Sequence, residues 1–229
     1  MTTLLKRLRA ELVEASDPGR APAMQAYMKS EMPFHGVPSA LLKATCKRVF
    51  AGAALVDAAS WRGEVLGLWR GARFREERYA AIQLSGDRRA RAWQTPATLP
   101  MYRELIVTGA WWDFVDEVAA RRIGPLLVGF PDKLRPLLLR WSRGADLWLR
   151  RTSIICQLHV GAACDLELMY ACIEPSLASK EFFLRKAIGW ALRQLARRQP
   201  DEVRRYVRAH RAELSGLSQR EALKHLGPL

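Results

Sequence analysis

The sequence predicts an all-α protein built from helical repeats, and three observations support this fold class. Apolar residues recur at three- and four-residue spacing almost throughout, which is typical of amphipathic helices. No sustained alternation of polar and apolar residues indicates a strand. Proline and glycine interrupt the pattern so that helix pairs fill roughly 35 to 45 residues each, as in HEAT-like or armadillo-like solenoids. An irregular helical bundle is the alternative.

The predicted breaks define about a dozen helices along the chain. The first helix covers the amphipathic segment MTTLLKRLRAELVEAS, which lacks the apolar run of an export signal. Breaks are then expected at Asp17–Gly19, Met32–Pro38, Gly71, Ser85–Asp87, Thr95–Pro96, Gly124–Pro125, Gly144, Gly161, Pro175, Pro200 and Ser215–Gly216. In the clearest pair, KEFFLRKAIGWALRQLARRQPDEVRRYVRAH, Gln199–Asp201 forms the turn, and Asp201 is an N-cap or first-turn acid.

Length and composition favour a single globular domain or one short repeat array over residues 1–229. Hydrophobic residues make up 49% of the chain and charged residues 26%, which argues against both a disordered chain and a membrane protein. No stretch reaches the roughly 18 apolar residues of a membrane span. We therefore expect a cytoplasmic monomer without membrane association.

The charge balance favours a polyanionic partner such as nucleic acid. The chain has 37 Lys and Arg residues against 23 Asp and Glu residues, a formal net charge of +14. Residues 180–229 carry half of this excess, since they hold twelve basic and five acidic residues. A surface of this sign attracts phosphate groups. An arginine-rich composition without any nucleic-acid role is the alternative interpretation.

The cysteines and histidines do not predict a metal site. Cys46, Cys156, Cys164 and Cys172 show no C-x-x-C spacing, and the four histidines lie far apart in the sequence. Buried, reduced thiols are the better interpretation.

An indole and a carboxylate share one face of a predicted helix in the segment GAWWDFVDEVAARRIG. Trp112 and Asp116 are four residues apart, so their side chains stand side by side. Asp113 lies nearer the start of the helix, where a carboxylate suits the N–H groups of the first turn. For Asp116 alone, a solvated or salt-bridged acid is the simpler interpretation.

Two further helices pair an indole with a positive charge. Trp148 and Arg151 are three residues apart in GADLWLRRTSIICQL, and Trp190 and Arg193 have the same spacing in FFLRKAIGWALRQLARR. Lys186 lies one turn before Trp190. Either core packing of these tryptophans or one shared functional cleft explains the pattern.

Such a cleft suits a cationic nucleotide. An N3- or N7-alkylated purine carries a positive charge that an indole face attracts, and a carboxylate stabilises both that cation and an oxocarbenium-like sugar. Because the base leaves neutral, little acid catalysis is needed, and the carboxylate is free to orient or deprotonate water. Arg151 and Arg193 are expected to hold flanking phosphates. The reaction requires no metal and no cofactor.

Four segments together, YMKSEMPFHGV, WWDFVDEVA, LWLRRTSII and FFLRKAIGWALRQLARRQPDEV, resemble the AlkD family of DNA alkylation repair glycosylases over nearly the whole chain. The resemblance implies one domain of HEAT-like repeats over residues 1–229, with a concave basic face that binds double-stranded DNA. It implies excision of cationic N3- and N7-alkylated purines, 3-methyladenine and 7-methylguanine, in base excision repair. It further implies that the lesion is handled from the sugar side while the base stays stacked.

The resemblance also assigns roles to residues. The active-site positions that it implies are Trp112, Asp116 and Trp190, with Arg151 in the same cleft. The further DNA-facing positions that it implies are Arg193 and Tyr27, and Lys186 is expected to bind DNA beside them through its charge. The segment after Tyr27 departs from the family pattern, because Pro38 and Ser39 stand where other members have a polar DNA contact. Two alternatives remain: a HEAT-like module that binds nucleic acid without cleaving the glycosidic bond, and a scaffold that binds an acidic protein. The presence of Asp116, Trp112 and Trp190 argues against the non-catalytic module.

Overall fold

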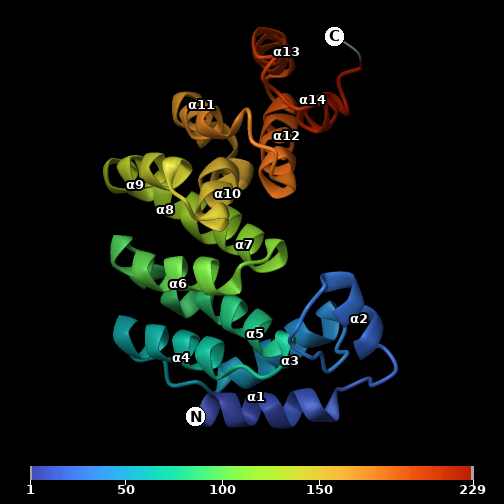
Figure 1. Cartoon of the computed structure of the whole chain (residues 1–229). Coiled ribbons are helices and arrows are strands. Elements are labelled where there is room, and N and C mark those ends of the chain that lie inside the picture. The colour runs from blue at the N-terminus through green and yellow to red at the C-terminus, as the bar shows by residue number, and fades with distance from the viewer. Residues whose placement is uncertain (1, 228–229) are drawn as a thin grey trace. The chain divides into compact units, whose positions relative to one another are not determined.

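The computed structural model describes residues 2–227, and all regular secondary structure within them is helical. This range contains 14 α helices, several short 3-10 segments, one π segment and no strand, so the all-α prediction is confirmed (Figure 1). The chain folds as two compact units that divide between Met101 and Tyr102.

The first unit is built from five α helices around a tryptophan-rich core. They are α1 (Thr3–Glu14), α2 (Ala21–Met28), α3 (Ser39–Ala51), α4 (Ala58–Gly71) and α5 (Arg75–Ser85). Helix α1 packs on α3 and α4, and α5 packs on α3 and α4. The side chains of Trp61, Leu8 and Leu12 are fully buried among them. Helix α2 differs from the others, since none of its residues is buried.

A buried carboxylate fixes the segment between α2 and α3. Glu76 of α5 is fully buried and accepts hydrogen bonds from the backbone N–H groups of three consecutive residues, His35, Gly36 and Val37, at 3.0 to 3.2 Å. Gly36 has φ +82°, and a Cβ there would lie 2.1 Å from the carbonyl oxygen of Asp17, so only glycine fits. The segment YMKSEMPFHGV therefore ends in a loop whose backbone is fixed by hydrogen bonds to Glu76 and requires glycine at position 36.

The second unit arranges its helices in two rows (Figure 1). Its elements are α6 (Leu99–Gly109, which begins at the unit boundary), α7 (Trp112–Val118), α8 (Gly124–Gly129), α9 (Pro131–Arg143), α10 (Leu147–Ile155), α11 (Leu166–Ile173), α12 (Phe182–Ala196), α13 (Pro200–Ala209) and α14 (Gly216–Leu223). Helix α10 packs on both α7 and α12, which form one row with it, and α9 packs on α11 in the other. Every indole–charge pair of the sequence lies on the row α7–α10–α12.

The predicted break at Gly124–Pro125 was wrong. Helix α7 runs through a π segment, Ala119–Ile123, directly into α8, and Gly124 keeps helical angles of φ −58° and ψ −53°. Proline normally ends a helix because it lacks an N–H group, but it is tolerated at the first positions of α8, where the wider π turn has already changed the hydrogen-bond pattern. Gly124 also lies against the backbone of Cys156, since a Cβ there would lie 2.3 Å from that carbonyl oxygen.

The other predicted breaks fall at helix ends or in 3-10 segments. The predicted first helix corresponds to α1. Gln199 is the N-cap of α13, and Asp201 is an acid of its first turn. Three breaks were missed: residues 52–57 between α3 and α4, Phe130 between α8 and α9, and Ala110 between α6 and α7, which adopts φ +45° and follows Gly109.

Candidate functional site

The centre of the candidate site is an ion pair between α7 and α10. Both nitrogens of one edge of the Arg151 guanidinium donate to Asp116, Nε to Oδ1 and Nη2 to Oδ2, each at 2.7 Å. The remaining nitrogen, Nη1, donates to the carbonyl oxygen of Phe183 at 2.6 Å. The side chains of Arg151 and Asp116 are 5% and 14% exposed. Asp116 is therefore a salt-bridged acid, but in a mostly buried site rather than on a solvated surface.

Burial and charge act in opposite directions on Asp116. Removal from water raises the pKa of its carboxyl group, the hydrogen bonds and positive charge of Arg151 lower it, and the negative charge of Asp113 raises it further; the net direction is upward. A carboxylate with a raised pKa accepts a proton more readily than an exposed one. Arg151 fixes the plane of this carboxylate through two parallel hydrogen bonds.

An aromatic cluster packs beside the ion pair. The ring of Trp111 lies 5.4 Å from that of Phe183 and 6.2 Å from that of Trp148, and Trp148 lies 5.0 Å from Phe183 between ring centroids. The Arg151 guanidinium carbon lies 5.9 Å from the Phe183 centroid. The indole nitrogen of Trp111 is buried, with no hydrogen-bond partner in the described range. Sequence analysis selected Trp112 and missed Trp111.

The two predicted active-site indoles lie on different helices of the same row. Trp112 is the first residue of α7 and is half-buried, four residues before Asp116, as the helical spacing predicted. Trp190 lies in the middle of α12 and packs, also half-buried, against the core of the second unit. Asp113 lies in the first turn of α7, where its carboxylate was expected.

The predicted DNA-facing residues lie in different environments. Lys186 and Arg193 of α12 both donate to the carboxylate of Glu221 on α14, with 2.9 Å between Lys186 Nζ and Oε1. Tyr27 lies on α2 in the first unit with 73% of its side chain exposed. Arg151 is almost completely buried, so its expected phosphate contact stays a prediction, and its observed partner is Asp116.

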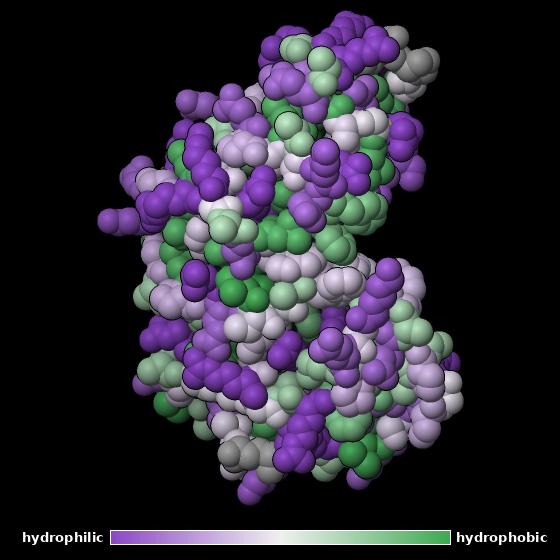
Figure 2. Space-filling model, viewed as in Figure 1, coloured by the Kyte–Doolittle hydropathy of each residue, from purple (hydrophilic) through white to green (hydrophobic). Residues whose placement is uncertain are grey.

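The basic surface extends beyond these residues. In Figure 2, hydrophilic side chains gather over α13 at the top of the view. Arg205 and Arg208 of α13 are exposed, as are Arg197 and Arg198 between α12 and α13. The positive charge predicted for the last fifty residues is therefore partly presented to solvent.

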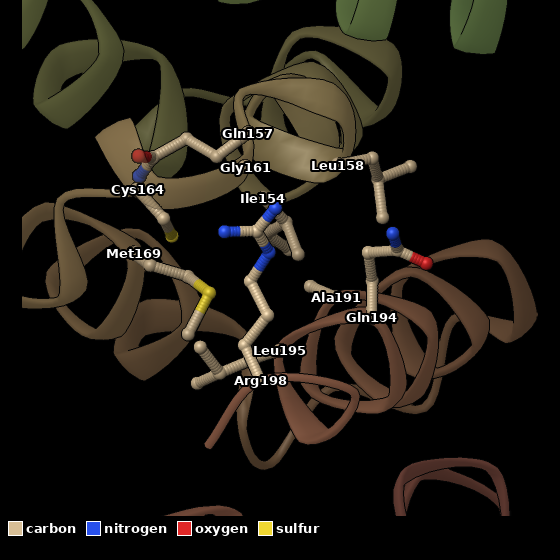
Figure 3. A pocket seen from close by; sticks show the side chains of 10 residues that line it. All are labelled: Ile154, Gln157, Leu158, Gly161, Cys164, Met169, Ala191, Gln194, Leu195 and Arg198. Atoms are coloured by element: carbon tan, nitrogen blue, oxygen red, sulfur yellow. The ribbon is translucent and has the colours of Figure 1, made fainter.

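A small cavity in the second unit is not lined by Asp116. This cavity of about 30 Å³ lies between α10, α11 and α12, and Arg198 extends across it (Figure 3). This is room for about two water molecules. None of its lining residues belongs to the candidate site.

Residues 2–227 contain neither a metal-binding cluster nor a membrane-spanning helix. No group of three or more histidine, cysteine or acidic side chains is placed to hold a metal ion. No helix in this range is long and apolar enough to cross a membrane. All four cysteines are free thiols, and three are buried; Cys164 is half-buried, contrary to expectation.

Fold and site together define an all-helical protein with a buried acid–arginine pair and a basic surface. The sequence profile of the DNA alkylation repair enzyme family matches residues 8–226, so the chain belongs to this family. A solved structure described as a predicted DNA alkylation repair enzyme from Enterococcus faecalis is 26% identical, with a TM-score of 0.77 over 93% of this chain and 98% of that one. No curated protein matches the chain. The family resemblance predicted from the four segments is confirmed.

Proposed function

We propose that this protein is a DNA glycosylase that hydrolyses the N-glycosidic bond of cationic N3- and N7-alkylated purines in duplex DNA. Membership of the DNA alkylation repair enzyme family supports this role. The observation that carries the proposal is Asp116, a mostly buried carboxylate held in one orientation by two hydrogen bonds from Arg151.

The chemistry assigned to Asp116 follows from charge. As the bond between the sugar C1′ and the purine nitrogen breaks, its electron pair leaves with the base, which becomes neutral, and positive charge develops on the sugar. The Asp116 carboxylate stabilises that charge. Water then adds to C1′, and its proton passes to Asp116 or to solvent. Trp112 and Trp190 supply aromatic faces that attract the cationic nucleotide.

The remaining residues have supporting roles in the proposal. Arg151 is a positioning residue, because its guanidinium fixes the carboxylate that faces the reaction. Lys186, Arg193 and Tyr27 bind the DNA backbone, the first two through their charge. The protein acts as a monomer in the cytoplasm, with the nucleoid as its site of action, and uses no cofactor.

Base release from methylated DNA tests the proposal. Purified protein is incubated with duplex DNA treated with a methylating agent, and free bases are separated by chromatography. We expect release of 7-methylguanine or 3-methyladenine, and none from unmethylated duplex. Binding to the methylated duplex without release of any base would instead support the non-catalytic nucleic-acid-binding alternative.

A further inference from the structure

Helix α14 covers the face of α12 that carries two of the proposed phosphate-binding residues. Lys186, Gly189 and Arg193 are spaced i, i+3 and i+7, so they share one side of α12. A Cβ at Gly189 would lie 2.5 Å from Glu221 Cβ and 3.0 Å from the Ser218 carbonyl oxygen. Only glycine therefore lets α14 approach this closely, and Glu221 is seated between the two cations.

Glu221 binds both cations at once. One carboxylate oxygen accepts from Lys186 and the other from Arg193. The hydrogen bond from Lys186, with the charges of Lys186, Arg193 and Lys224, lowers the pKa of Glu221 despite partial burial, so it is ionised at neutral pH. Its side chain is only 17% exposed, against 39% for Lys186 and 23% for Arg193.

Between Lys186 and Arg193, the Glu221 carboxylate resembles the phosphodiester group of a DNA backbone. Both groups present two anionic oxygens, each able to accept a charge-assisted hydrogen bond from one cation. We propose that Lys186 and Arg193 form one site for a DNA backbone phosphate and that Glu221 occupies this site in the free protein as an intramolecular competitor. The inference rests on the proposed function, which supplies the duplex.

Competition has a direct consequence for selectivity. Any duplex that uses this site must first displace the Glu221 carboxylate, and the lost ion pairs reduce the net gain from the phosphate contact. Binding to undamaged DNA, which depends mainly on backbone phosphates, is weakened most. Contacts made elsewhere to a damaged nucleotide offset the loss.

The variant Glu221→Gln tests the competition, because it keeps the size of the side chain and removes its charge. The probe is a fluorescently labelled, unmodified 20-base-pair duplex, titrated at several salt concentrations. We expect affinity to rise by up to about fivefold, the range of a partly exposed ion pair. The plot of log affinity against log salt should steepen by about one. Unchanged or weaker binding by folded variant protein overturns the proposal.

A matched control separates competition from net charge. Glu213→Gln makes the same charge change at an exposed acid that pairs with His210, away from the two cations. We expect little change in its affinity, and an equal gain would overturn the proposal. In the background of Lys186→Ala with Arg193→Ala, the gain from Glu221→Gln should disappear; a persistent gain also overturns it.

A second variant covers the case in which Glu221→Gln disrupts the packing of α14. If thermal unfolding shows that Glu221→Gln does not fold, Glu221→Asp keeps the charge but cannot reach both cations, and a smaller gain in affinity is expected; weaker binding overturns the proposal. Base release separates the two proposals. If the wild-type protein releases no base but Glu221→Gln still tightens duplex binding, the glycosylase function fails and the phosphate site stands. If the wild-type protein releases methylated bases but Glu221→Gln binds the duplex no more tightly, the glycosylase function stands and the phosphate site fails.

Discussion

Asp116 and Arg151, 35 residues apart in sequence, form a bidentate ion pair in which both side chains are mostly buried. A buried pair of this kind is a weak source of stability, because the loss of hydration opposes the attraction between the charges. Removing one partner is nevertheless costly, at about 3 to 5 kcal/mol, since the other charge is left uncompensated. A pair that contributes little net stability but fixes a carboxylate is consistent with a role in chemistry.

The first prediction concerns the charge of Asp116. Asp116→Asn keeps the shape of the side chain but removes the negative charge that stabilises the sugar cation, so base release should fall by about 100-fold or more. Affinity for duplex DNA should stay similar or rise slightly, because a negative charge is lost. Single-turnover base release and fluorescence anisotropy measure the two effects. Undiminished release by Asp116→Asn would remove this residue from the mechanism.

The second prediction concerns the pH dependence that Arg151 sets. Arg151 lowers the pKa of Asp116 against the effect of burial, so Arg151→Met should raise that pKa further. The carboxylate works when deprotonated, and base release therefore falls as the pH drops through its pKa. The acid limb of the rate profile should lie at higher pH in Arg151→Met than in the wild-type protein.

The neighbouring residue provides the control for this pH profile. Arg150 donates to Ser176 Oγ and the Pro175 carbonyl oxygen rather than to Asp116. Arg150→Met should therefore leave the position of the acid limb unchanged. An equal displacement in both variants, or none in Arg151→Met, would contradict the assignment of Arg151 as the positioning residue.

The third prediction concerns stability at Gly124. Gly124→Ala places a methyl group 2.3 Å from the carbonyl oxygen of Cys156, which is backbone and cannot move without shifting α10 and α8. The free energy of unfolding should fall by about 1 to 3 kcal/mol. Gly129→Ala is the control, since a Cβ there meets nothing within 4 Å. Urea unfolding measures the free energy of unfolding of both variants. Equal stability of the two would show that the close approach of Gly124 to Cys156 does not require glycine.

The fourth prediction concerns the acid sensitivity of the loop before α3. His35 is 7% exposed, its ring stacks on Phe74 at 3.8 Å, and its Nε2 is buried with no hydrogen-bond partner in the described range. Burial lowers the pKa of His35 below its ordinary value of 6.5. Below pH 6.5 the His35 side chain therefore binds a proton more readily in the unfolded chain than in the folded one. The contribution of neutral His35 to the free energy of unfolding is present above pH 6.5 and is lost as the pH falls.

Urea unfolding at pH 7.5 and pH 5.5 measures this effect. His35→Phe keeps an aromatic ring against Phe74 and removes the titrating group. We expect the free energy of unfolding to fall less between the two pH values in His35→Phe than in the wild-type protein. The same fall in both proteins would assign the acid sensitivity to other groups.

Local sequence signals predicted the helices well but not the partners of their side chains. The spacing of Trp112 and Asp116 correctly indicated a shared helix, because that relationship depends on periodicity alone. Which of the adjacent residues Trp111 and Trp112 enters the aromatic cluster depends on the exact residue at which α7 begins, and Gly109, the last residue of α6, does not define that residue. The pairing of Asp116 with Arg151 depends on packing between helices distant in sequence, which periodicity does not encode.

Glycine failed to predict helix ends at positions where close packing between helices, and not a turn, requires it. Gly124 was expected to end a helix, but the close approach of Cys156 requires glycine within a continuous one. Gly189 gave no break signal at all, although it sets the distance between α12 and α14. At both positions glycine is needed for its small volume and not for its backbone freedom, a distinction that only the tertiary structure reveals.

Helix α2 has a consequence for the dynamics of the first unit. None of its residues is buried, while the loop that follows it is fixed by the carboxylate of Glu76. Amide groups in α2 should therefore exchange with solvent deuterium through small local openings, whereas those of His35, Gly36 and Val37 should exchange only with the opening of the α5 core. Tyr27 is therefore expected to lie on a segment that opens at a lower free-energy cost than the loop to which it is attached.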